Sequence, residues 1–148
     1  MMQYFVDTNV LLRAVAPQSA QHGTATRAIK ALLASGEELS IAAQVVMEFW
    51  AVATRPLDVN GYGWTAAETE AQVNALLSQF SLLPETPAVF AEWLSLVRGI
   101  GVVGKQVHDA HIVAVMNIHG VRRLLTFNAT DFAAYNVEIV SPESAVRI

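Results

Sequence analysis

The chain has 148 residues, no cysteine and a formal net charge of −4. This length is enough for one domain with a sizeable core, and the lack of cysteine excludes a disulfide framework and a thiolate zinc site. No apolar run reaches membrane-spanning length and no signal-peptide pattern is present, so we expect a cytoplasmic protein without membrane contact. The negative charge argues against a general nucleic-acid binder, unless bound cations offset it.

Strand and helix patterns alternate along the chain. Short apolar runs predict five strands, at residues 3–6, 39–42, 81–83, 122–126 and 137–140. Apolar residues at spacings of three and four predict helices at residues 8–15, 24–34, 45–54, 65–80, 88–98 and 107–119, with loops at 57–63 and 99–104. This order predicts one α/β domain over residues 1–148, with a mostly parallel sheet and helices on both faces. The aromatic residues that we expect in its core are Phe49, Trp50, Trp64, Phe90 and Trp93.

Asp7 ends the first predicted strand and directly precedes a predicted helix. In an open α/β sheet, ligands bind at the carboxyl ends of the strands. Aspartate is also a favoured helix N-cap that stabilises by roughly 1 kcal/mol, so Asp7 by itself is compatible with either role. Thr8 is an equally suitable cap, which leaves Asp7 available for chemistry.

Glu48 and Asp109 are two further carboxylates that we expect at the same edge of the sheet. Glu48 lies beside Phe49 and Trp50 on an apolar helix, where a buried carboxylate without a partner is costly. The alternative for Glu48 is a partly exposed side chain paired with Arg55. Asp109 lies in the first turn of the most apolar helix, where an acid also stabilises the helix dipole. That same turn directs the Asp109 side chain toward the carboxyl edge of the sheet.

Asn128 and Asp131 follow the fourth predicted strand, and either can reach this edge. The alternative for Asp131 is a simple capping role in a short helix. Carboxylates that lie together raise one another's pKa values unless a cation neutralises them. Because the candidate ligands are all oxygen donors, the sequence predicts Mg²⁺ or Mn²⁺ rather than zinc. Such ions activate water and stabilise the leaving oxygen in phosphodiester cleavage.

Four short motifs follow one another along nearly the whole chain. They are Val-Asp-Thr-Asn-Val at 6–10, Val-Val-Met-Glu-Phe at 45–49, His-Asp-Ala-His at 108–111 and Leu-Thr-Phe-Asn at 125–128. This ordered set resembles the PIN-domain family, and most closely the VapC-like toxins of type II toxin–antitoxin pairs. By position, Asp7, Glu48 and Asp109 match the three invariant acids of the family. The fourth acidic position is occupied by Asn128 in this chain.

The resemblance implies a PIN-like, Rossmann-like fold with a parallel five-stranded sheet, and a ribonuclease that depends on Mg²⁺ or Mn²⁺. It also implies a homodimer and inhibition by a cognate antitoxin, with DNA contacted only through that antitoxin. Under this hypothesis Asp7, Glu48 and Asp109 bind the metal and are catalytic, and Asn128 or Asp131 completes the site. The side chains that we expect to contact the RNA substrate are Thr8, Asn9, Lys105 and Thr126.

Two other functions are compatible with parts of the sequence. A PIN-like module without catalytic activity would bind RNA or protein through the same pocket. The segment Gly99-Ile100-Gly101-Val102-Val103-Gly104 matches the G-x-G-x-x-G pattern of dinucleotide-binding sites, with Arg122 and Arg123 available to select NADP. Such a site must follow a strand, whereas a helix is predicted before this segment.

Overall fold

Five strands form one sheet in the computed structural model, which describes residues 2–147. The strands are β1 Gln3–Val6, β2 Glu38–Ile41, β3 Ser81–Leu82, β4 Arg123–Leu125 and β5 Glu138–Val140. Their spatial order is β3-β2-β1-β4-β5, and every neighbouring pair is parallel. The parallel five-stranded sheet predicted from the sequence is therefore confirmed, with β1 at its centre.

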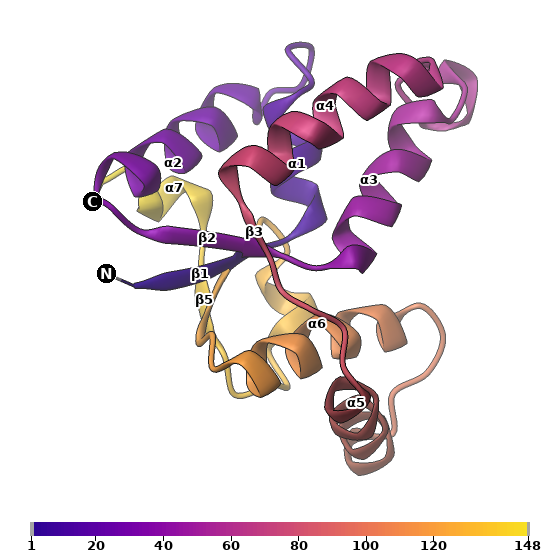
Figure 1. The fold of residues 1–148 in the computed structure, drawn as a ribbon, viewed down its shortest axis with the longest axis vertical. Coiled ribbons are helices and arrows are strands. Elements are labelled where there is room, and N and C mark those ends of the chain that lie inside the picture. The colour runs from indigo at the N-terminus through magenta and orange to yellow at the C-terminus, as the bar shows by residue number, and fades with distance from the viewer. Residues whose placement is uncertain (1, 148) are drawn as a thin grey trace.

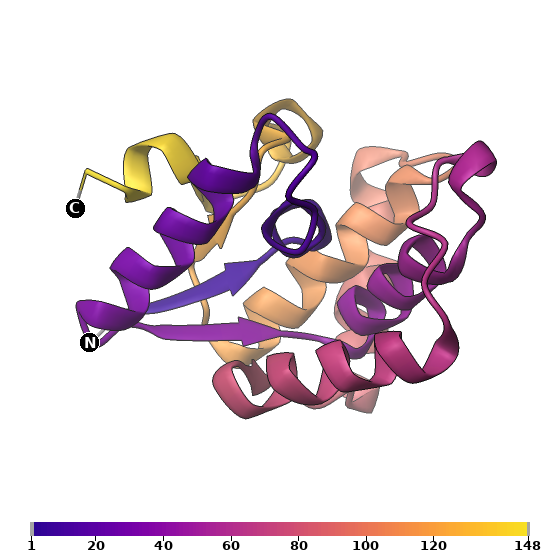
Figure 2. The same ribbon diagram turned by 90° about the horizontal axis from the view of Figure 1, so that it is seen from above.

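Helices cover both faces of the sheet. The α-helices are α1 Thr8–Ala14, α2 His22–Ala34, α3 Ala43–Thr54, α4 Ala66–Gln79, α5 Pro87–Ile100, α6 Gln106–His119 and α7 Pro142–Ala145, with 3₁₀ helices η1 Leu57–Val59 and η2 Ala129–Phe132. Figure 1 shows α5 and α6 below the strands and α1, α2 and α4 above them. In Figure 2, β1 leads directly into α1, which is seen nearly end-on. No helix within residues 2–147 is long and apolar enough to cross a membrane.

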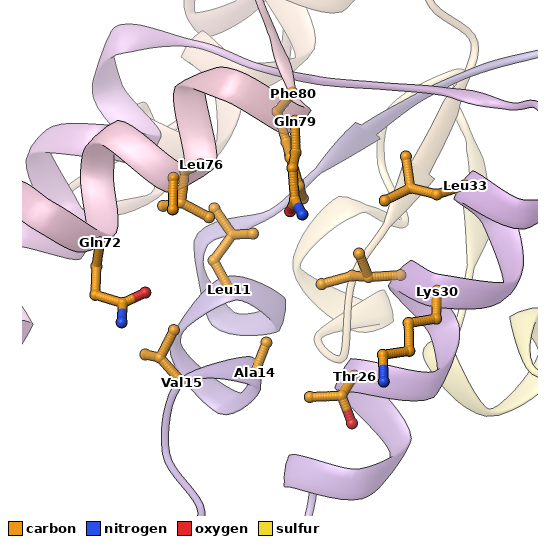
Figure 3. Close-up of a pocket in the computed structure, with 12 residues that line it drawn as sticks. Leu11, Ala14, Val15, Thr26, Lys30, Leu33, Gln72, Leu76, Gln79 and Phe80 are labelled. Atoms are coloured by element: carbon orange, nitrogen blue, oxygen red, sulfur yellow. The ribbon is translucent and has the colours of Figure 1, made fainter.

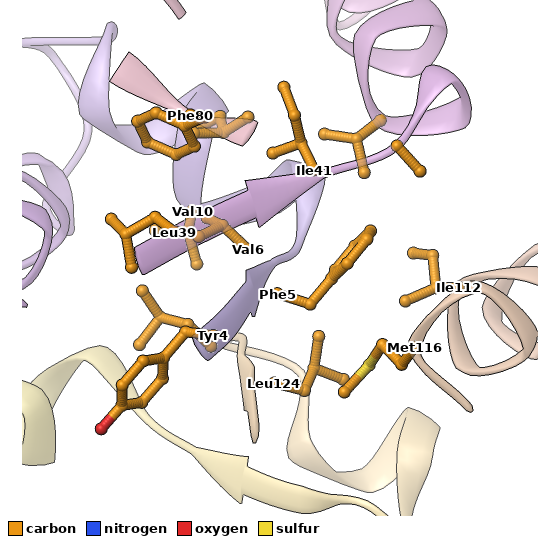
Figure 4. Packing of buried hydrophobic residues seen from close by; sticks show 14 of the residues in the cluster. Tyr4, Phe5, Val6, Val10, Leu39, Ile41, Phe80, Ile112, Met116 and Leu124 are labelled. Atoms are coloured by element: carbon orange, nitrogen blue, oxygen red, sulfur yellow. The ribbon is translucent and has the colours of Figure 1, made fainter. Parts of the chain in front are cut away.

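Apolar packing between the sheet and the helices holds these layers together. Phe5 of β1 and Leu124 of β4 are fully buried and lie toward Ile112 of α6 (Figure 4). Residues 112–116 of α6 are all buried because this helix lies between the sheet and α5. Helix α5 forms the outer layer, and Val89 is its one fully buried residue. Strands β1 and β4 and helix α6 therefore form one side of the core.

Several elements differ from the sequence-based expectations. Helix α5 continues to Ile100, and not only to residue 98, because Gly101 adopts the left-handed conformation that ends a helix. Phe90 is 60% exposed and is not a core residue, since the outer face of α5 has no layer over it. Helices α7 and η1 were not foreseen, although Ser141 and Pro142 are typical of a helix start, whereas η2 is the short helix considered around Asp131. The other boundaries shift by one or two residues.

The end of β1 beside β4 is where the order of the strands reverses. From β1 the chain runs to β2 and β3 on one side, whereas β4 and β5 lie on the other side. Val6 is in register with Leu125, and the backbone N–H of Asp7 donates to the carbonyl of Leu125 at 3.0 Å. Ligands of open α/β sheets bind at such a switch point. The topology thus places Asp7 where a ligand site is expected.

Candidate functional site

Asp7 lies at this switch point and also begins helix α1. Its Oδ1 accepts a hydrogen bond from the Thr8 backbone N–H at 2.8 Å, which makes it the N-cap of α1. Its Oδ2 accepts hydrogen bonds from Thr126 Oγ1 at 2.8 Å and from Asn9 Nδ2 at 3.0 Å. Asp7 is only 8% exposed, and this burial raises its pKa although the hydrogen bonds from Thr126 and Thr8 lower it. Asp7 is therefore both the N-cap of α1 and a buried carboxylate at the edge of the sheet where a ligand is expected.

Thr126 and Asn9 connect the end of β1 to the end of β4. The fully buried hydroxyl of Thr126 donates to Asp7 Oδ2 and accepts a hydrogen bond from Asn9 Nδ2 at 3.2 Å. Asn9 Oδ1 accepts the backbone N–H of Phe127 at 3.1 Å. These bonds hold the Asp7 carboxylate in one orientation. Both side chains, which we expected to contact substrate, are thus engaged with a candidate metal ligand.

Glu48 projects from α3 toward the start of α1. Its Oε1 accepts hydrogen bonds from Thr8 Oγ1 at 3.0 Å and from Gln44 Nε2 at 3.3 Å. Arg55, the alternative partner of Glu48, forms no ion pair with it in the described part of the chain. Thr8 is buried, so this third expected substrate contact also holds a carboxylate. The hydroxyl of Thr8 therefore ties Glu48 to the residue that follows Asp7.

Asp109 lies in the first turn of α6, as predicted. Its pKa is raised from 3.8 to about 6, first by burial and then by the negative charges of Asp131, Asp7 and Glu48. Lys105 opposes this rise. The charges of Glu48 and Asp131 also raise the pKa of Asp7. Four acids from separate segments of the chain thus lie within electrostatic reach of one another.

Asn128 and Asp131 both lie on the segment after β4, and both are exposed. Asp131 is in the first turn of η2, and among the neighbouring charges it has the largest effect on Asp109. The backbone N–H of Asn128 donates to Thr126 Oγ1 at 3.0 Å. Of these two residues, Asp131 is therefore the one that adds negative charge to the cluster.

The chemistry of these four acids suits a hard divalent cation. All are carboxylates, the ligands that Mg²⁺ and Mn²⁺ prefer, and no lysine or arginine within residues 2–147 forms an ion pair with any of them. However, no three histidine, aspartate or glutamate side chains of those residues are arranged to hold a metal ion as they stand. The donor types fit a cation, and the side chains would have to adjust to enclose one.

Residues 4–138 match the family model described as PIN domain. The chain belongs to the PIN-domain family. Curated proteins give no significant sequence match. Among solved structures, the chain is similar to VapBC2 from Rickettsia felis bound to a DNA fragment from their promoter, with 15% identity, coverage of 95% of this chain and 98% of that chain, and a TM-score of 0.68.

Two further solved structures have the same PIN fold. VapC20 from Mycobacterium tuberculosis, described as a sarcin-ricin loop cleaving toxin, is 24% identical over 91% of this chain and 97% of that chain, with a TM-score of 0.65. A toxin–antitoxin complex from Klebsiella pneumoniae is 22% identical over 94% of this chain and 97% of that chain, with a TM-score of 0.66. The resemblance to VapC-like toxins is therefore confirmed as a shared fold.

Three residues near the acids of this PIN domain have contacts that the sequence does not reveal. Gln44 precedes Glu48 by one helical turn, which is visible in the sequence, but its Oε1 contacts His111 Nδ1 on α6. The phenol of Tyr135 has its pKa raised by burial and by the charge of Asp109. Tyr135 therefore lies close enough to Asp109 to interact with it, although 26 residues separate the two positions.

The segment from Gly99 to Gly104 is not a dinucleotide-binding loop. Gly99 and Ile100 are the last residues of helix α5, so the glycine segment follows a helix and not the strand that a dinucleotide-binding loop requires. The element after the segment is helix α6. The NADP-binding alternative therefore lacks the strand that it requires. Lys105 follows this turn and is exposed at the start of α6, close enough to Asp109 to lower its pKa.

A groove separate from the acids lies between α1, α2 and α4 (Figure 3). Its walls are mostly apolar, and Lys30 is the one charged residue that lines it. The residues that line the groove are Leu11, Ala14, Val15, Thr26, Ile29, Lys30, Leu33, Gln72, Ala75, Leu76, Gln79 and Phe80. None of the four acids is among them, so this groove is a candidate binding surface distinct from the acid cluster.

The raised pKa of Asp109 predicts how stability depends on pH. The folded protein binds more protons than the unfolded chain between the pKa values of 3.8 and about 6, so the free energy of unfolding should fall as the pH rises through that window. After allowance for solvent screening, we expect a loss on the order of 1–2 kcal/mol. This loss in the free energy of unfolding is measured by urea unfolding of wild type and Asp109→Asn at several pH values, in the presence of a chelator.

The free energy of unfolding of Asp109→Asn should fall less than that of wild type as the pH rises, so the variant should be more stable than wild type at pH 7. Asp58→Asn, at an exposed carboxylate on η1, is the matched control and should follow the wild-type profile. Parallel profiles for wild type and Asp109→Asn would show that the pKa of Asp109 is not raised in the folded protein.

Proposed function

We propose that this PIN domain is a Mg²⁺- or Mn²⁺-dependent endoribonuclease that acts as the toxin of a type II toxin–antitoxin pair. The observation that carries this proposal is the grouping of Asp7, Glu48, Asp109 and Asp131 at the switch point of the sheet, where none of them forms an ion pair with a lysine or arginine of residues 2–147. Burial and mutual repulsion of carboxylates favour a bound cation. The shared fold with structures described as VapBC2 and as a sarcin-ricin loop cleaving toxin supports the same proposal.

The residues would divide the work as follows. Asp7, Glu48 and Asp109 would hold the ion, and Asp131 or Asn128 would complete its ligand set. A bound divalent ion supplies an activated water and stabilises charge on the phosphate. Hydrogen bonds from Thr126 and Thr8 keep the Asp7 and Glu48 carboxylates oriented, and exposed Lys105 would contact an RNA phosphate.

Removal of either central acid tests the catalytic assignment. Asp7→Asn and Asp109→Asn should each lower Mg²⁺-dependent RNA cleavage by more than about 100-fold, since loss of a ligand should exceed the effect of losing an outer-shell partner. Asparagine also caps helices, so α1 should remain intact in Asp7→Asn. The measurement is cleavage of a labelled RNA, with circular dichroism to verify folding. Wild-type cleavage rates in both variants would refute the assignment.

A non-catalytic PIN-like module is the second candidate function. One observation favours it, namely that no three acidic or histidine side chains among residues 2–147 are arranged to hold a metal ion. Calorimetric titration with Mn²⁺ separates the two candidates. The nuclease should take up Mn²⁺ in stoichiometric amounts and lose that uptake in Asp109→Asn. A folded wild-type protein that binds RNA and takes up no Mn²⁺ would support the module.

The proposed antitoxin would dock in the groove between α1, α2 and α4. The apolar groove walls suit the apolar face of a helical segment. Homodimerisation is a separate prediction, which rests on the resemblance alone. Ala75 is exposed on the α4 wall, so Ala75→Glu should leave the fold intact and place a charge in the interface. We expect binding of the proposed antitoxin to weaken by more than about 10-fold.

Ala71→Glu, at an exposed residue of the same helix outside the groove, is the matched control and should bind normally. RNA cleavage should be unchanged in both variants, because neither residue belongs to the acid cluster. Equal binding by wild type and Ala75→Glu, measured by calorimetry, would exclude the groove as the docking surface.

A further inference from the structure

The amide of Gln44 joins helix α3 to the turn of α6 that carries Asp109. Gln44 Nε2 donates hydrogen bonds to Glu48 Oε1 at 3.3 Å and to the backbone carbonyl of His108 at 3.0 Å. That carbonyl belongs to the peptide group between His108 and Asp109. One NH₂ group therefore contacts the carboxylate of one proposed metal ligand and the backbone of another.

His111 determines which way this amide faces. A glutamine amide presents a donor on one side and an acceptor on the other, and a half-turn exchanges them. His111 Nδ1 contacts Gln44 Oε1, and His111 Nε2 contacts Glu85 Oε2 at 2.8 Å. When Nδ1 donates to the amide oxygen, the NH₂ group faces the two oxygen acceptors on Glu48 and His108. After a half-turn, the amide oxygen would instead face those two oxygens, which is unfavourable.

The contacts form one continuous path from the surface to the acid cluster. Glu85 is exposed in the segment between β3 and α5, and the path continues through His111 and Gln44 to Glu48 and Thr8. The path links α3 to α6 at the level of the candidate site. Neither Gln44 nor His111 is itself one of the proposed ligands.

We propose that Gln44, held by His111, is a positioning residue that sets Glu48 relative to Asp109 for binding of a divalent cation. This inference rests on the proposed metal-dependent function. Partners that orient metal ligands through hydrogen bonds typically change metal affinity by about 10–100-fold when they are removed. Gln44 fits this role because its amide contacts Glu48 and, at once, the carbonyl of His108, the residue before Asp109.

A purely structural link between helices would give a different result. Helix α6 also contacts the segment before α5 through His119, whose Nε2 lies 2.8 Å from the carbonyl of Pro84. This second contact uses the same side-chain type on the same helix, next to Glu85, but does not lead to Glu48. His119→Ala is therefore a matched control for His111→Ala. Loss of a purely structural contact lowers the melting temperature and leaves the cation affinity of the folded protein unchanged.

The test measures Mn²⁺ affinity by calorimetry and the melting temperature of the full chain. Gln44→Leu, which keeps most of the side-chain volume, and His111→Ala should each weaken Mn²⁺ binding by about 10-fold or more. The double variant should bind no more weakly than Gln44→Leu alone, because both residues act through one amide. His119→Ala should bind Mn²⁺ as wild type does, whatever its melting temperature.

Wild-type affinity in Gln44→Leu would overturn the positioning role. An equal loss of affinity in His119→Ala would also overturn it, because the effect would then come from displacement of α6 as a whole. If wild type takes up Mn²⁺ and Gln44→Leu and His111→Ala bind it with the same affinity, this inference fails and the proposed function stands. If wild type takes up no Mn²⁺, this inference and the proposed function both fail.

Discussion

Negative charge buried where β1 meets β4 is the constraint on which the rest of this structure depends. Two opposing effects act on Asp7: hydrogen bonds from Thr126 and Thr8 lower its pKa, and burial together with neighbouring acids raises it. The net direction is upward, so the hydrogen bonds orient the carboxylate without compensating for its lost hydration. A positive charge at the site would remove the remaining cost. The fold therefore holds acids where water is scarce, an arrangement that the proposed cation would stabilise.

The four acids are not equally constrained. Asp7 and Glu48 each accept hydrogen bonds from side chains of the surrounding elements. The carboxylates of Asp109 and Asp131 accept none from residues 2–147, and Lys105 is the cation that offsets the charge of Asp109. Asp7 and Glu48 are thus held by hydrogen bonds at the start of α1 and on α3, whereas Asp109 and Asp131 are not held in this way within the described part of the chain. This difference explains why neighbouring acids raise the pKa values of Asp7 and Asp109 although no three acidic or histidine side chains of residues 2–147 are arranged to hold an ion.

The sequence predicts the features that depend on local patterns. Asp7 follows a short apolar run, and Asp109 begins an apolar helix, so the sheet edge and both carboxylates follow from neighbouring residues alone. The exposure of Phe90 depends on the layer that α5 occupies, which no local pattern encodes. Helix α5 passes through Gly99 because glycine inside a helix costs only about 1 kcal/mol and Gly101 provides the stop.

The pairing of Gln44 with His111 joins positions 67 residues apart. Spacing within α3 relates Gln44 to Glu48, but nothing in that helix shows that α6 will lie against it. Hydrogen bonds between helices depend on side-chain orientation in the packed structure, and so become visible only with coordinates. The same reason applies to Thr8 and Thr126, whose sequence context suggests exposed polar contacts. Their burial assigns their hydroxyls to the acids instead.

Helix α1 connects the two candidate surfaces of the molecule. Asp7 caps its amino end, and Leu11 lines the groove one turn later, about 6 Å along the helix axis. A partner that fills the groove thus packs against the helix whose first residue, Thr8, holds Glu48. Any displacement of α1 would move Asp7 and Thr8 together, because Asp7 caps the helix and Thr8 is its first residue. The groove and the acid cluster therefore share one short helix.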